Sequence, residues 1–95
     1  MNIEDFEIKI KKFDEKKSVV YVNVIIHQEL ELRGFVARYG ETKYSHSVPI
    51  WFVKPPSVLG RNKKSFYIVY LKNPTLWQLL EKKIIDSAKE YTDLL

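Results

Sequence analysis

The chain has 95 residues, 45% of them apolar and 14% aromatic, with a net charge of +4 and no cysteine. This length fits a single domain, residues 1–95, with one modest core, and the apolar fraction lies outside the disordered range. Disulfides, thiolate metal sites and cysteine nucleophiles are excluded. The longest apolar run, residues 19–26, is too short to cross a bilayer, and the acidic N-terminus does not resemble a secretory signal. We therefore expect a soluble, cytoplasmic protein without membrane contact.

Three strands are predicted in the first part of the chain. Residues 6–11 alternate between apolar and charged side chains, which indicates a half-buried strand. Residues 19–26 are rich in β-branched side chains and predict a central strand covered on both faces. Residues 30–39 predict a third strand, in which Gly34 indicates a bulge or a close backbone approach.

Two more strands are predicted before the C-terminal segment. Residues 47–53 predict an edge strand, since Pro49 has no N–H to donate to a neighbouring strand. The paired prolines that follow end this strand, and residues 58–64 are predicted to form a loop. Residues 66–71 predict the fifth strand.

A single helix is predicted at the C-terminus. Thr75 and Gln78 have the spacing of a capping box, and Pro74 prevents helix continuation upstream. An apolar stripe follows at helical spacing: Trp77, Leu80, Ile84, Ala88 and Tyr91. The predicted class is α+β, a five-stranded, mostly antiparallel sheet with one C-terminal helix on one face. The sequence leaves open which face the helix covers, because residues 19–26 do not alternate.

The residue types needed for catalysis are sparse. The two histidines are His27, near Glu29, and His46, between two serines. Neither arrangement has the spacing of a metal site, and neighbouring residues on a strand point in different directions, which disfavours a Ser–His pair. There is no glycine-rich phosphate loop. We therefore expect no enzyme, no metal or other cofactor, and no small-molecule substrate.

Basic and aromatic residues in the middle of the chain form the best candidate binding surface. Residues 33–72 contain eight basic side chains and one acidic side chain, Glu41, so this segment attracts anions. Nucleic-acid binding needs cations for phosphates and flat side chains for unpaired bases. The predicted phosphate contacts are Arg61, Lys63 and Lys64, flanked by Lys54, Lys72 and Arg38, and the predicted stacking residues are Tyr67 or Trp51, if exposed.

The order of these features resembles the SpoVG family, small bacterial septation regulators that bind nucleic acid. The family's opening Ile-x-x-Val-x-Ile strand is similar to residues 3–10, and its Val-x-Met-Pro-Ser segment is similar to residues 53–57, where Pro55 replaces the Met. A basic loop, a strand, a helix-opening proline and a final Glu-Tyr follow in both, here ending at Glu90 and Tyr91. The resemblance covers residues 3–91.

The resemblance implies a homodimer, formed by pairing sheet edges, that binds DNA or RNA with little sequence preference. Two alternatives stay open. One is a protein–protein adaptor that docks a partner on an aromatic sheet face or an open edge strand. The other is a small enzyme, which would need an enclosed pocket with convergent polar groups.

Overall fold

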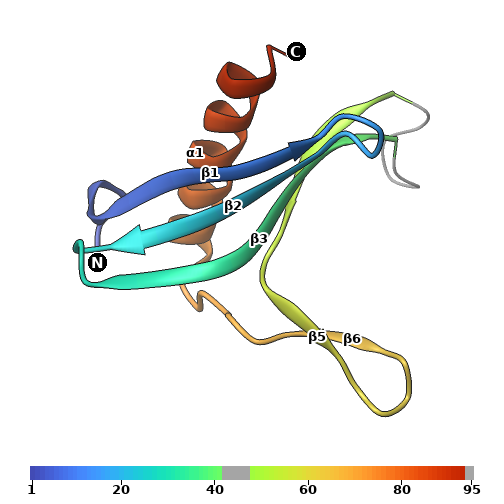
Figure 1. Cartoon of the computed structure of the whole chain (residues 1–95). Helices are drawn as coiled ribbons and strands as arrows, with labels where there is room; N and C mark the ends of the chain where they lie inside the picture. Colours follow the sequence, from blue (N-terminus) through green and yellow to red (C-terminus); the bar gives the residue numbers. More distant parts are fainter. Residues whose placement is uncertain (42–47, 94–95) are drawn as a thin grey trace.

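The structure is a computed structural model that describes residues 1–41 and 48–93. The chain is α+β, with antiparallel strands followed by one C-terminal helix, as predicted (Figure 1). In chain order the elements are η1 (Ile3–Asp5), β1 (Phe6–Asp14), β2 (Val19–Ile26), β3 (Leu30–Gly40), β4 (Ile50–Lys54), β5 (Ser57–Leu59), β6 (Ser65–Tyr67) and α1 (Pro74–Thr92).

The main sheet has four antiparallel strands in the order β1-β2-β3-β4. A turn at residues 15–18 joins β1 to β2, and a tight turn joins β2 to β3. In this second turn His27 and Gln28 have φ values of 53° and 60°, and the Glu29 N–H donates to the Ile26 carbonyl at 3.0 Å. Two consecutive residues with left-handed backbone conformation suit the twist of the paired strands. The three predicted strands, 6–11, 19–26 and 30–39, thus follow one another as a continuous meander.

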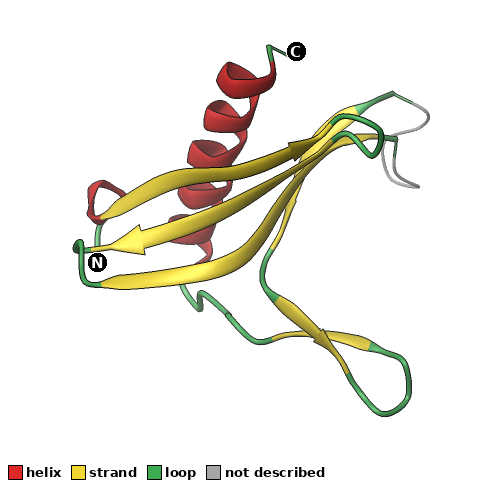
Figure 2. Ribbon diagram, viewed as in Figure 1, coloured by secondary structure: helices red, strands yellow, loops and turns green. Residues whose placement is uncertain are grey.

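The predicted five-stranded sheet is wrong in its last strand. Residues 66–71 were predicted to be that strand, but β6 covers residues 65–67, and among the described strands it pairs only with β5. Most of β5 lies in the segment 58–64, which was predicted to be a loop. Pro55 and Pro56 separate β4 from β5, and both are buried. Because proline lacks an N–H and restricts the preceding residue, the pair ends the main sheet and redirects the chain. Figure 2 shows the resulting two-stranded arm, residues 57–67, extending away from the sheet and the helix.

One face of the sheet packs against α1, which lies behind the strands in Figure 2. On β2 the side chains of Val20, Val22 and Val24 are fully buried on this face. Strand alternation therefore places Tyr21 on the other side of the sheet, which we call the open face. The buried core consists of Phe6, Val20, Val22, Val24, Phe35, Ala37, Trp51, Leu76, Leu80, Ile84 and Ala88.

The helix begins at Pro74, two residues earlier than a cap at Thr75 predicts. Asn73 is the N-cap, since its side-chain oxygen accepts hydrogen bonds from the N–H groups of Thr75 at 3.0 Å and Leu76 at 3.2 Å. Pro74 occupies the first helical position, where a missing N–H has no cost. The capping box predicted at Thr75 is therefore wrong, because the better capping residue stands two positions upstream. No helix in the described residues is long and apolar enough to cross a membrane.

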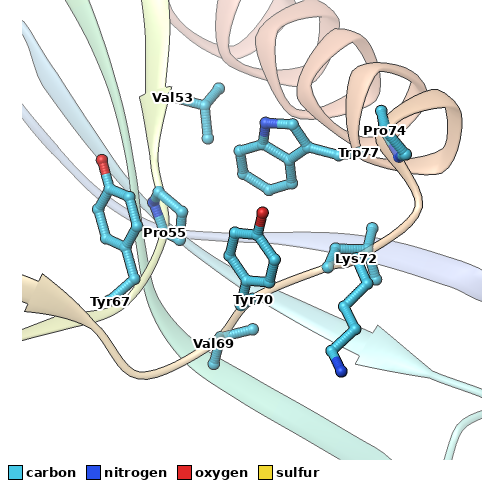
Figure 3. A pocket seen from close by; sticks show the side chains of 9 residues that line it. Val53, Pro55, Tyr67, Val69, Tyr70, Lys72, Pro74 and Trp77 are labelled. Atoms are coloured by element: carbon cyan, nitrogen blue, oxygen red, sulfur yellow. The ribbon is translucent and has the colours of Figure 1, made fainter.

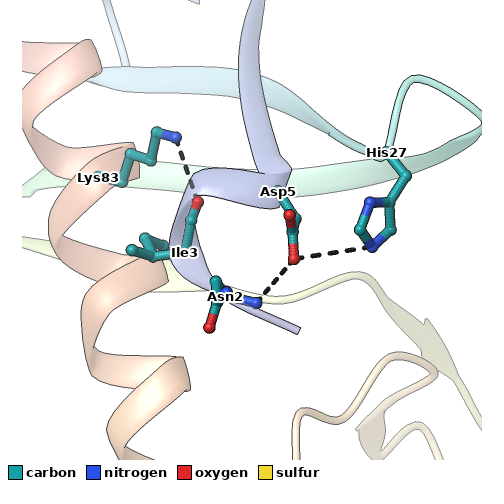
Figure 4. Close-up of polar contacts among 5 residues, drawn as sticks. All are labelled: Asn2, Ile3, Asp5, His27 and Lys83. Carbon is teal, nitrogen blue, oxygen red and sulfur yellow. Dashed lines mark hydrogen bonds and ion pairs between the residues drawn. The ribbon is translucent and has the colours of Figure 1, made fainter.

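The N-terminal turn is tied to α1 by a lysine (Figure 4). Lys83 donates from Nζ to the carbonyl oxygen of Ile3 at 3.3 Å and to that of Phe6. On the other side of this turn, Asp5 accepts from the Asn2 N–H at 2.8 Å and lies 3.7 Å from His27 Nε2. These contacts account for the positions of Lys83 and His27 without a ligand.

Gly34 has both features predicted for it. Val22 pairs with Phe35 and Val24 with Leu32, so β3 has one more residue than β2 between these pairs. This is a β-bulge, and Gly34 within it has a φ of 103°. A Cβ atom on Gly34 would lie 3.4 Å from the Cβ of Pro56, so the start of the arm rests against this position.

Gly34→Ala is expected to lower the free energy of unfolding by about 1–3 kcal/mol, because a residue with a side chain is strained at this φ. Denaturant titration would measure the loss. Gly40→Ala is the matched control, since a Cβ there meets nothing within 4 Å and the φ of Gly40 is not in the left-handed region. Equal stabilities of the two variants would contradict the expectation.

Candidate nucleic-acid interface

The tip of the arm is a compact basic loop. The Gly60 N–H donates to the Lys64 carbonyl at 2.9 Å, and the Lys63 N–H donates to the Gly60 carbonyl at 3.0 Å. These bonds close the loop, so Arg61, Lys63 and Lys64 lie together and all three are exposed. None of them forms an ion pair with a described acidic residue. The loop therefore presents three cations that an anion can approach from water.

A hollow of about 330 Å³ lies between the base of the arm, the segment of residues 69–72 and the start of α1 (Figure 3). Tyr67, Tyr70 and Trp77 contribute its aromatic rings, and Lys72 lies at its edge with its amino group pointing away from them. Tyr67 is 53% exposed, as stacking on a base requires. The hollow is lined by Val53, Pro55, Tyr67, Val69, Tyr70, Leu71, Lys72, Pro74 and Trp77.

Lys54 connects this region with the sheet. It is the last residue of β4, and together with Ser65, Phe66 and Tyr67 it lines a shallow depression beside the arm. Lys54 also pairs with Val36 on the open face. The structure thus brings three predicted site residues to the base of the arm: Lys54, Tyr67 and Lys72.

Arg38 lies on the open face, away from the hollow. It is exposed on β3, where its cross-strand partner is Phe52 on β4. The neighbouring pairs, Ala37 with Val53 and Tyr39 with Trp51, belong to the core side. Arg38 and Lys54 therefore share one face of the sheet, because residues two apart on paired strands point the same way.

Trp51 was predicted to stack on bases only if exposed, and the structure buries it. Its side chain is 9% exposed and points toward α1, as part of the core. Its ring lies 5.4 Å from that of Tyr39, centroid to centroid, at an interplanar angle of 50°. The indole Nε1 is buried without a hydrogen-bond partner among the described residues. The alternation of β4 turns Phe52 to the open face instead, where it is half-buried.

The open face carries opposite charges at its two ends. Glu31 accepts a hydrogen bond from Asn23 Nδ2 at 3.1 Å, and this bond, followed by the contact with Arg33, lowers the pKa of Glu31 below its ordinary value. Glu31 is therefore ionised at neutral pH and lies in the same cross-strand row as Glu7. Arg38 and Lys54 lie toward the opposite end, so an anion would be directed to that half of the face.

His27 has no partners for metal binding among the residues that the structure describes. His27 is placed by Asp5, and no group of three His, Cys, Asp or Glu side chains in the described residues could hold a metal ion. His46 and the serines beside it lie outside the described residues.

Comparison with known proteins gave no match to any family model, curated protein or solved structure. The resemblance to the SpoVG family therefore stays a prediction.

Proposed function

We propose that this chain is a cytoplasmic nucleic-acid-binding regulatory protein with low sequence specificity, that it acts as a homodimer, and that it has no catalytic role. The observation that carries the proposal is the basic loop at the tip of the arm, exposed and without acidic partners in the described residues, next to exposed aromatic rings. Cations that neutralise phosphates release condensed counterions, which provides affinity without reading bases.

Each predicted residue other than Trp51 has a role consistent with its position. Arg61, Lys63 and Lys64 would contact phosphates, because they are the exposed cations of the arm. Lys54 and Lys72 flank the base of the arm and would extend the phosphate track there. Tyr67 would stack on an unpaired base, and Arg38 would act from the open face.

The direct test is binding of the purified protein to labelled single-stranded DNA, duplex DNA and RNA at two salt concentrations. We expect measurable affinity at low salt that falls steeply as salt rises, with little dependence on base sequence. Absence of binding at low salt would overturn the proposal.

The homodimer is supported by apolar side chains on the arm. Val58 and Phe66 form a cross-strand pair on the arm and are 41% and 55% exposed. Leu59 on the arm is 70% exposed, and Ile68, directly after the arm, is 58% exposed. An isolated two-stranded hairpin is marginally stable in water, and contiguous exposed apolar side chains are typical of interaction surfaces. A second copy packing on the arm would remove this surface from water.

Light scattering is expected to give a mass of about twice 11.3 kDa for the wild-type protein. Leu59→Asp should shift the mass to that of the monomer, because a charge would be buried at the contact. Leu30→Asp is the matched control, since Leu30 is 55% exposed at the start of β3, outside the arm. A monomeric wild-type protein, or equal effects of both variants, would contradict the dimer.

The same apolar side chains favour a second candidate function, a protein–protein adaptor that uses the arm or the open sheet face to dock another protein. Leu59, Phe66 and Tyr70 would then be the contact residues, with 70%, 55% and 76% exposure. Failure to bind any nucleic acid at low salt would favour this function.

A further inference from the structure

The basic half of the open face has two aromatic rings among its cations. In one cross-strand row, residues from all four strands lie side by side: Lys12, Tyr21, Val36 and Lys54. The next row toward the β1–β2 turn contains Asp14, Val19, Arg38 and Phe52. The alternation that buries Val20, Val22 and Val24 against α1 turns all these side chains to the side that the helix does not cover.

The two rings are held in place and remain partly accessible. Tyr21 on β2 and Phe52 on β4 are both half-buried, so their neighbours restrict them while part of each ring faces water. An aromatic side chain already fixed by its strand loses little rotamer freedom when a flat ligand stacks on it. A stacking surface of this kind tolerates any base, because every base has a flat π face.

The charges around the rings fit an anionic strand. Lys12 and Lys54 stand at the two ends of the row of Tyr21, and Arg38 is the cross-strand neighbour of Phe52. All three cations are exposed, and none forms an ion pair with a described acidic residue. Asp14 is the one acidic side chain in these two rows.

A base-paired duplex does not fit the two rings, because of their spacing and because its bases have no free faces. Two strand spacings of about 4.8 Å and one two-residue step along the strand put Tyr21 and Phe52 roughly 12 Å apart. Bases in a duplex stack at about 3.4 Å and expose no faces to a protein surface. Only an unpaired, extended strand could place one base on each ring, with another nucleotide between them.

We infer that the open face is a platform for single-stranded nucleic acid, on which Tyr21 and Phe52 each stack on a base while Lys12, Arg38 and Lys54 contact the phosphates. This inference rests on the proposed function and adds the ligand class and a second contact surface to it. Lys54 lines the depression beside the arm as well as the platform, so one strand can continue from the open face toward the basic loop.

The first test is photo-cross-linking of the wild-type protein to an oligonucleotide that carries 5-iodouracil. The platform predicts cross-links to Tyr21 or Phe52, identified by mass spectrometry of the digested complex. Cross-links confined to Tyr67 or Tyr70 would overturn the platform and leave the proposed function standing. If the wild-type protein binds no nucleic acid, the platform and the proposed function both fail.

The second test compares Tyr21→Val and Phe52→Val with the wild-type protein. Valine keeps the strand preference, so each variant should fold. Each is expected to weaken single-strand binding roughly 5- to 150-fold, with an unchanged salt dependence, because a stacking ring but no charge is removed. Tyr91→Ala is the control, because it removes an aromatic ring that is 59% exposed near the end of α1. Unchanged affinity in both valine variants, or a preference of the wild-type protein for duplex DNA, would overturn the platform.

Discussion

Replacing Arg61, Lys63 and Lys64 together with glutamine is expected to weaken binding to single-stranded nucleic acid roughly 50-fold at about 0.15 M salt. Each phosphate contact on a single strand contributes about 0.7 to the slope of log affinity against log salt, so the slope should fall by about 2. The loss should be similar for all base sequences, because phosphate contacts carry no sequence information. Fluorescence anisotropy over a salt series measures both quantities.

The control for this variant must remove the same charge from another surface. Lys16, Lys17 and Lys89 are exposed and lie outside the arm, so their joint replacement with glutamine changes the net charge equally. We expect this control to lose much less affinity. If both triple variants bind equally weakly, net charge alone governs the affinity and the arm is not the contact surface.

Ile84→Ala is expected to lower the free energy of unfolding by about 2–5 kcal/mol. Ile84 is fully buried at the centre of the apolar face of α1, so truncation removes buried surface and leaves a cavity between helix and sheet. Small domains have about 5–15 kcal/mol of stability in total, so this one change removes a large share of it. Denaturant unfolding followed by circular dichroism measures the change.

Leu79→Ala is the matched control on the same helix. Leu79 is 43% exposed, so the same kind of truncation removes less buried surface, and a loss below about 1 kcal/mol is expected. A comparable loss in both variants would mean that α1 does not pack on the sheet through the face that contains Ile84.

An element can be predicted from the sequence when its apolar residues recur with one period over enough positions, or when a single glycine marks a special backbone conformation. Residues 6–11 alternate through three apolar and charged pairs, and the helix stripe returns through Leu80, Ile84 and Ala88, so both elements were predicted. Gly34 also predicted the bulge in β3, because residues other than glycine rarely adopt the backbone conformation that it has. Tyr91, at the end of the predicted stripe, is exposed, because the helix has passed beyond the sheet there.

The predictions failed in segments whose apolar residues show no recognisable period. The strands of the arm have three residues each, which is too short for an alternation to be recognised, so β5 was missed and β6 was assigned to the main sheet. In β4 four consecutive apolar residues, 50–53, conceal which of them face the core, so the sequence left open whether Trp51 is exposed.

The candidate interface was predictable in its charges and only partly in its shape. The cations at positions 61–64 are visible in the sequence, and the structure places them together on one loop. Trp77 joins the hollow and Tyr21 the open face only through tertiary packing and strand register. Neither role could be predicted from the sequence, because Trp77 fits the helix stripe and Tyr21 lies in a run without alternation.

The contact between Pro56 and Gly34 has a consequence for the thermodynamics of recognition. Pro56 has a fixed φ, rests on the bulge of β3, and accepts a hydrogen bond from the Ile68 N–H at 2.9 Å, so both ends of the arm are tied at one point beside the sheet. The direction of the arm is thereby set before any partner arrives. A partner that binds the arm consequently meets a preorganised surface, and little conformational entropy is lost in orienting it.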